Sequence, residues 1–148
     1  KKRGLGPEDI IHKQFANAIK SLESIKGLKC KFWTYFPSGE KRVASTGSLL
    51  KSKGLKAGVA DYLFIRTDSN HIDHILWIEI KAPERESVSF DVDKNVMIRK
   101  KIKAGKQSDS QIAFENLFSR SRNSYYGVVH SVGDGLAMLE SEGFIKSS

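Results

Sequence analysis

The sequence predicts a single domain of the α/β class. Residues 7–25 carry apolar side chains every three or four positions, which is the spacing of one face of a helix. The segments 60–67 and 72–81 are short, are rich in β-branched and aromatic residues, and read as strands. Helical and strand-like segments then alternate along the chain, and this alternation is typical of α/β domains.

The first helix is expected to open at Pro7 and Glu8, because proline fits the first turn and an acid is stabilised at the positive end of the helix dipole. Gly27 is expected to end it. Its core-facing positions are Ile11, Phe15, Ile19 and Leu22. The aromatic run 31–36 predicts a strand, closed by a turn at 37–39.

A short helix is expected over residues 43–53, stopped by Gly54, before the strands 60–67 and 72–81. Pro83 bars continuation of the second strand. Residues 84–106 are charged and lack a clean period, so they are expected to form a long mobile loop or a partly structured flap.

The C-terminal part is expected to begin with a helix capped by Ser108 or Asp109. A strand over 125–131 and a short helix from Asp134 follow it. The predicted order is therefore α–β–α–β–β–α–β–α, without an internal repeat, and one domain spans residues 1–148.

Composition favours a polyanionic partner. The formal charge of the 148 residues is +8 and the sequence pI is about 9.6, which points to nucleic acid before membrane; the alternative is ordinary solvation of a basic surface. No apolar run approaches the ~20 residues of a membrane span. Cys30 is the only cysteine, which excludes an intramolecular disulfide and fits a reducing cytoplasm. The chain begins with Lys1 rather than Met, so its numbering is compatible with a start inside a longer native chain.

The most informative residues are Asp61, Glu79 and Lys81. Side chains alternate between the faces of a strand, so Glu79 and Lys81 project to one side while their apolar neighbours project to the other. An antiparallel pair of strands would bring Asp61, at the start of one, near Glu79, at the end of the next. Two buried carboxylates favour a divalent cation, and a nearby lysine would face a phosphate or a water. The alternative is a half-exposed ion pair between neighbouring strands.

Three further features support a metal site. Gly54 and Gly58 flank the approach to Asp61 and let the backbone come close to a phosphate. Gln111 lies on the helix side that is expected to face the sheet, and a buried amide needs polar partners; its alternative role is to bond the exposed backbone of the helix start. Glu8 points inward along the first helix, or else serves only the helix dipole.

In combination these motifs resemble the VRR-NUC domain of the PD-(D/E)XK nuclease superfamily, in its compact stand-alone phage and bacterial form. The resemblance covers nearly the whole chain. It rests on Arg42, Leu50–Asp61 (LKSKGLKAGVAD), Trp77–Ala82 (WIEIKA), Gln107–Gln111 (QSDSQ) and Tyr126–Ser131 (YGVVHS), in this order. It implies a central mixed sheet flanked by helices.

The resemblance also implies roles for individual residues. Asp61 and Glu79 resemble the metal ligands, together with the main-chain carbonyl of Ile80, and Lys81 resembles the catalytic lysine. Gln111 and Glu8 resemble the glutamine and the acid that complete the site. Two departures stand out: Ala60 replaces the usual proline, and the segment between Lys81 and Gln111 is longer than usual.

The expected function is a Mg²⁺- or Mn²⁺-dependent DNA endonuclease that selects a branched structure such as a Holliday junction, in a bacterial or phage-infected cytoplasm. The alternatives are a non-catalytic nucleic-acid binder on the same fold and a flap- or RNA-directed nuclease. Basic side chains are expected to contact the nucleic-acid backbone. They are Lys41, Arg42, Lys51, Lys53, Lys56, Arg99, Lys100, Lys101, Lys103 and Lys106.

Two symmetric cuts in a junction require two sites, so a homodimer is expected, with an interface at the strand 32–36 or at Leu136 and Leu139. The aromatic residues of that strand either stack on bases or belong to the core. His71 and His74 either bind a metal or lie in an exposed polar turn, and the turn is favoured.

Overall fold

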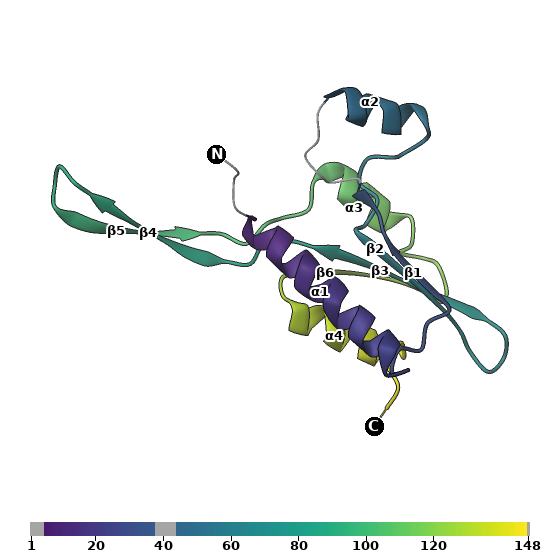
Figure 1. The fold of residues 1–148 in the computed structure, drawn as a ribbon. Helices are drawn as coiled ribbons and strands as arrows, with labels where there is room; N and C mark the ends of the chain where they lie inside the picture. Colours follow the sequence, from purple (N-terminus) through teal and green to yellow (C-terminus); the bar gives the residue numbers. More distant parts are fainter. Residues whose placement is uncertain (1–4, 38–43, 148) are drawn as a thin grey trace.

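The protein is built on a four-stranded mixed sheet with helices packed against it (Figure 1). The computed structural model describes residues 5–37 and 44–147. The strands lie in the order β1–β2–β3–β6, all neighbours being antiparallel except β3 and β6, which are parallel. Their bounds are β1 Phe32–Tyr35, β2 Tyr62–Thr67, β3 Asp73–Ile80 and β6 Ser124–Val129. The predicted α/β class with a mixed sheet is confirmed.

The helices follow the predicted order. They are α1 Pro7–Ser24, α2 Ala44–Ser52, α3 Asp109–Asn116 and α4 Val132–Ser141. α1 begins at its proline and carries two acids in its first turn, as the dipole argument requires. Across residues 5–37 and 44–147, no helix has both the length and the apolar character needed to cross a bilayer.

One face of the sheet forms the main core with α1 and α4. Leu76, Ile78 and Ile80 of β3 project from this face and are fully buried. They pack with Phe15 and Ile19 of α1 in one apolar cluster that also contains residues of α4. Leu139 of α4 lies inside this cluster, so the expectation that it belongs to a dimer interface is wrong.

The opposite face is covered by α3. Trp77 of β3 packs edge-on against Phe114, with ring centroids 5.0 Å apart, and also contacts Phe118. α3 ends at Asn116, and Leu117, directly after it, is largely exposed. Successive side chains of β3 point to opposite faces of the sheet. The apolar ones therefore lie against α1 and α4, and Trp77 and Glu79 lie on the side of α3.

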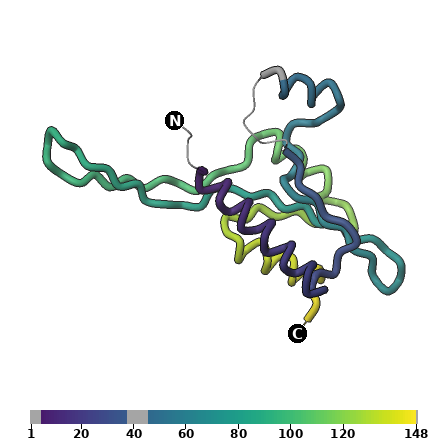
Figure 2. Tube along the Cα trace, viewed as in Figure 1, coloured from purple at the N-terminus to yellow at the C-terminus, as the bar shows by residue number. Residues whose placement is uncertain are grey.

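Residues 84–106 contain a regular β-hairpin where a loop or a partly structured flap was expected. β4 (Arg85–Asp91) and β5 (Val96–Ile102) pair with each other in a separate sheet and extend away from the body of the protein (Figures 1 and 2). The Asp91 carboxylate accepts the N–H groups of Asp93 and Lys94 and so fixes the turn. Both faces of the hairpin mix apolar and charged side chains, which removes the alternation that identifies a half-buried strand.

A tight approach of backbones positions the segment that leads into β2. Gly58 has φ +84°, and a Cβ on it would collide with the main chain of Ser110 at the start of α3. Gly54 has φ +99°, but a Cβ there would meet no atom of the described chain within 4 Å. A side chain at Gly54 would therefore cause backbone strain alone, whereas a side chain at Gly58 would cause backbone strain and a steric clash.

Gly58→Ala should destabilise the protein more than Gly54→Ala. The left-handed conformation costs a side chain roughly 1–2 kcal/mol at either position, and overpacking against Ser110 adds about 1–3 kcal/mol at Gly58 alone. Urea denaturation of both variants measures the difference. Equal losses of unfolding free energy would contradict the close packing of this segment on α3.

Candidate active site

Asp61 and Glu79 meet at one end of the sheet, as predicted. Asp61 directly precedes β2, Glu79 is the penultimate residue of β3, and continuation of the β2–β3 register places them opposite each other. The main-chain N–H of Ile80 donates to Asp61 Oδ2 at 2.7 Å. The two residues are only 5% and 1% exposed, which excludes the alternative of a half-exposed ion pair.

Glu79 is held by a glutamine and approached by a lysine. Gln111 Nε2 donates to Glu79 Oε1 at 2.6 Å, and Lys81 Nζ lies 3.7 Å from the same oxygen. The other oxygen, Oε2, is buried and has no hydrogen-bond partner among the described residues. The structure thus brings three predicted site residues together on the α3 side of the sheet.

The start of α3 fixes the orientation of Gln111. Its side-chain oxygen accepts the Ser108 N–H at 2.8 Å, and its own N–H donates to Ser108 Oγ at 3.3 Å, which forms a capping box. The amide oxygen is therefore occupied by the helix start, and the amide NH₂ is left to face Glu79. Gln111 therefore bonds the backbone at the helix start and also contacts a buried polar side chain, which are the two roles that the sequence left as alternatives.

His12 was missed by the sequence reasoning and lies on the Asp61 side of the site. Its Nε2 atom is 3.7 Å from Asp61 Oδ2 and 3.9 Å from Glu8 Oε1, and its Nδ1 atom is 3.2 Å from the Tyr62 hydroxyl. Glu8 therefore approaches Asp61 through His12, on the partly exposed rim of the site. The sequence feature that could have identified His12 is its position, one helical turn after Glu8 on the same face of α1.

Burial disfavours the ionised form of both carboxyl groups. Loss of solvation, and then the neighbouring Asp61, raise the pKa of Glu79 to about 8. Burial also raises the pKa of Asp61 despite its hydrogen bond from Ile80. The bond to His12 lowers the pKa of Glu8 instead. Near neutral pH the buried pair therefore retains a proton in the absence of a cation.

The residues present fit a small, hard divalent cation. Mg²⁺ takes oxygen ligands, usually one or two carboxylates completed by water and substrate oxygens. Asp61 and Glu79 supply two carboxylates, Glu79 Oε2 has no other described partner, and the main chain of Ile80 runs beside Asp61. Among residues 5–37 and 44–147, no group of three or more His, Cys, Asp or Glu side chains is placed so that it could hold a metal ion.

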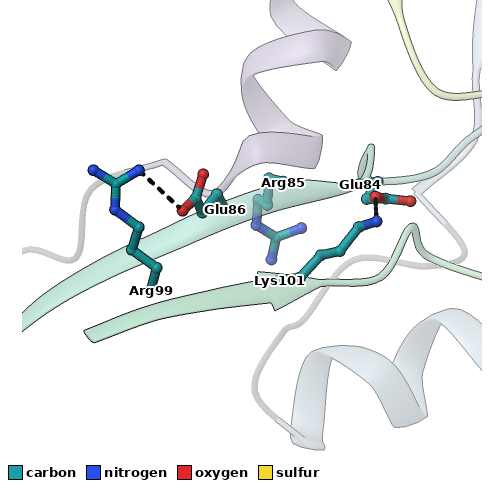
Figure 3. Close-up of a pocket in the computed structure, with 5 residues that line it drawn as sticks. All are labelled: Glu84, Arg85, Glu86, Arg99 and Lys101. Carbon is teal, nitrogen blue, oxygen red and sulfur yellow. Dashed lines mark ion pairs between the residues drawn. The ribbon is translucent and has the colours of Figure 1, made fainter. Parts of the chain in front are cut away.

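The predicted basic residues are not equivalent. In the hairpin, Lys101 Nζ lies 2.7 Å from Glu84 and Arg99 Nη1 lies 3.7 Å from Glu86, around an open cavity of about 520 Å³ (Figure 3). Lys100 lies on the other face of β5. Among the predicted residues, five further lysines are exposed and form no ion pair with an acid of the described residues: Lys51, Lys53, Lys56, Lys103 and Lys106. The predicted residues Lys41 and Arg42 lie outside the described ranges.

His71 lies in the turn between β2 and β3, and His74 lies just after it, at the start of β3. His74 Nε2 lies 2.8 Å from Asp68 Oδ2, and its ring stacks on Tyr125. His71 has φ +62° and is exposed in the same turn. Asp68 also accepts the N–H groups of Asn70 and Ile72, so this group of residues stabilises the turn.

No known protein family matches this chain by sequence, and neither a curated protein nor a solved structure shows significant similarity to it.

The stability of the metal-free protein should fall between about pH 5 and 8. In this interval folded Glu79 binds a proton that the unfolded chain, with a pKa near 4.5, has released, so each rise in pH favours unfolding. The expected slope is on the order of 1 kcal/mol per pH unit. Glu79→Gln should flatten it, whereas the exposed control Glu84→Gln should not.

The measurement is urea denaturation in EDTA at several pH values. Asp61 adds a smaller slope of the same sign, so the variant curve should be shallower rather than flat. Parallel curves for wild type and Glu79→Gln would contradict the raised pKa.

Proposed function

We propose that this protein is a Mg²⁺- or Mn²⁺-dependent deoxyribonuclease with a PD-(D/E)XK core of the VRR-NUC type. The observation that carries the proposal is the buried pair of Asp61 and Glu79, with Lys81 beside it, at the end of two adjacent strands. A stabilising role alone does not account for this arrangement, because burial raises the pKa of both carboxyl groups and the neighbouring Asp61 raises that of Glu79 further, which opposes folding. Such clusters are typical of functional sites.

A bound divalent cation would lower the pKa of a water molecule and stabilise charge on the phosphate oxygens. Asp61 and Glu79 would hold that cation, and the Ile80 carbonyl would be the additional ligand that the family resemblance implies. Gln111 keeps the Glu79 carboxylate in one orientation through its 2.6 Å hydrogen bond. Lys81, whose side chain is largely buried, places a positive charge where negative charge develops during hydrolysis.

The proposed substrate is DNA with a branch. A charge of +8 favours a polyanion, and exposed lysines on the α2 side and at the base of the hairpin provide contacts to phosphates. Such contacts respond to backbone shape rather than to base sequence. Cleavage of a four-way junction would additionally require a homodimer, for which the edge strand β1 remains available whereas Leu139 does not.

The proposal is tested with the protein, Mg²⁺ or Mn²⁺, and labelled linear, flapped and four-way DNA of the same sequences. Cleavage of a branched substrate that EDTA abolishes is the expected result. Binding of all substrates without cleavage under any of these conditions would contradict the nuclease and leave a nucleic-acid-binding protein. Light scattering at micromolar concentration determines whether cleavage is performed by a dimer.

Asp61→Asn should abolish cleavage while leaving DNA binding intact or tighter, because the variant loses a cation ligand and a charge that repels phosphate. Calorimetry should show that Mn²⁺ binding is lost as well. Asn keeps the size of the side chain, so thermal unfolding verifies the fold. Cleavage at the wild-type rate would exclude Asp61 as a ligand.

Lys81→Met should lower kcat by about 10²-fold or more and change KM little, since the charge acts on the transition state. Lys103→Met removes the charge of an exposed lysine near the base of the hairpin. This variant is the matched control and should retain the kcat of the wild type. Single-turnover kinetics separate chemistry from product release. A rise in KM alone would make Lys81 a phosphate contact.

The salt dependence of binding should identify the DNA-contacting lysines. Each phosphate contact contributes about −0.9 to the log–log slope on duplex DNA. Replacement of Lys51, Lys53 and Lys56 by alanine should flatten the slope by up to about 2.7, and replacement of Lys100, Lys103 and Lys106 measures the hairpin separately. An unchanged slope in both triple variants would contradict binding through these regions.

A further inference from the structure

An aromatic groove lies between α1 and the edge strand β1, on the side of the site where His12 is found. It has a volume of about 570 Å³. One wall is α1, with Lys13, Ala16 and Lys20, and β1 with Tyr62 forms the other wall and the floor. α1 and β1 run beside each other and line the same groove (Figures 1 and 2).

The groove presents aromatic side chains that the core does not bury. Trp33 and Tyr35 lie on the same face of β1 and are only partly buried, although they pack at the margin of the core. The Trp33 ring is nearly parallel to that of Phe64, with a 12° interplanar angle, and to that of Tyr62, with 28°. These contacts fix the ring orientations before any ligand arrives, which lowers the entropy cost of stacking.

Positive charge follows the groove along α1. Lys13 and Lys20 are exposed and seven residues apart on one face of the helix, which corresponds to about 10 Å along its axis. The acid Asp9 lines only the end near Leu5. Lysines at this separation suit phosphates about two or three nucleotides apart along one strand.

The groove adjoins the candidate active site at His12. His12 lines the groove and also lies 3.7 Å from Asp61, and Tyr62 both lines the groove and directly follows Asp61 in sequence. A chain that occupied the groove would therefore pass His12, which lies beside Asp61.

We propose that this groove binds an unpaired segment of a nucleic-acid strand, with bases stacked on Trp33 and Tyr35 and phosphates on Lys13 and Lys20. The inference rests on the proposed function and specifies its substrate: DNA whose branch exposes a short single strand next to the scissile bond. Aromatic stacking platforms flanked by basic side chains are how proteins bind single strands without reading sequence. A stacked duplex hides the faces of its bases, so duplex DNA is not a ligand for this groove.

The test measures binding of a labelled ten-nucleotide oligothymidylate by fluorescence anisotropy in EDTA, where no metal-dependent cleavage occurs. Trp33→Leu should weaken binding about tenfold, the typical effect of losing one stacked base. Phe32→Leu is the matched control, because Phe32 is 52% exposed on the opposite face of the same strand. It should bind as wild type, and an unlabelled duplex of equal length should compete poorly.

A second pair of variants leaves the aromatic packing intact. Lys13→Ala with Lys20→Ala should reduce the salt slope by about 1.4, which is two single-strand phosphate contacts. Lys29→Ala with Lys146→Ala changes two exposed lysines away from the groove and should leave the slope unchanged. Thermal unfolding of all four variants verifies that they are folded.

The inference is overturned if Trp33→Leu and Phe32→Leu bind the oligonucleotide alike, or if duplex DNA competes as well as a single strand. Failure of the nuclease proposal looks different. The oligonucleotide would then still bind through Trp33, but no DNA would be cleaved in Mg²⁺ or Mn²⁺. Cleavage of branched DNA together with equal binding by the two leucine variants would retain the nuclease and reject the groove.

Discussion

The burial of two acidic side chains next to each other is the constraint on which the rest of the structure depends. Asp61 and Glu79 are both almost inaccessible, and burial raises the pKa of each. The surrounding chain donates a hydrogen bond to each carboxylate: the main-chain N–H of Ile80 donates to Asp61, and the amide of Gln111 donates to Glu79. One carboxylate oxygen of Glu79 still lacks a partner among the described residues. A site that is stabilised in part and left incomplete at one atom is suited to a ligand that completes it.

The α3 helix links the architecture of the fold to this chemistry. Its capping box engages one end of the Gln111 side chain and directs the other end at Glu79. Its aromatic residues pack on Trp77, two residues before Glu79 on the same face of β3. Its first turn also touches Gly58, three residues before Asp61. Displacement of α3 would therefore disturb both carboxylates at once, and the position of the helix relative to the sheet is as important as the identity of the acids.

The sequence was sufficient for those features that depend on local periodicity. The order of the helices and of the four strands of the main sheet, the faces of β3, the meeting of Asp61 with Glu79 and the inward position of Gln111 all follow from strand alternation, helical spacing and turn residues. The hairpin was missed because both of its faces are exposed, so that no pattern distinguishes them. His12 was missed because its partners lie about 50 residues away in sequence, and the ion pairs of Arg99 and Lys101 depend on a register that only strand pairing defines. The burial of Leu139 likewise depends on the packing of α4 against α1.

The way in which the hairpin is attached has a consequence for how this protein can change. The chain leaves the body after Ala82 and returns at Gly105, where the N–H of Gly105 donates to the carbonyl of Ala82 at 2.8 Å and closes the base of the excursion. Everything between these two residues can be lengthened, shortened or exchanged without moving either end. The hairpin is thus a separate structural unit, inserted directly after Ala82, the residue that follows Lys81. Variation in length at this junction would change the hairpin while the sheet and the Asp61–Glu79 pair stay in place, and the same junction offers a site for the insertion of a reporter or a second domain.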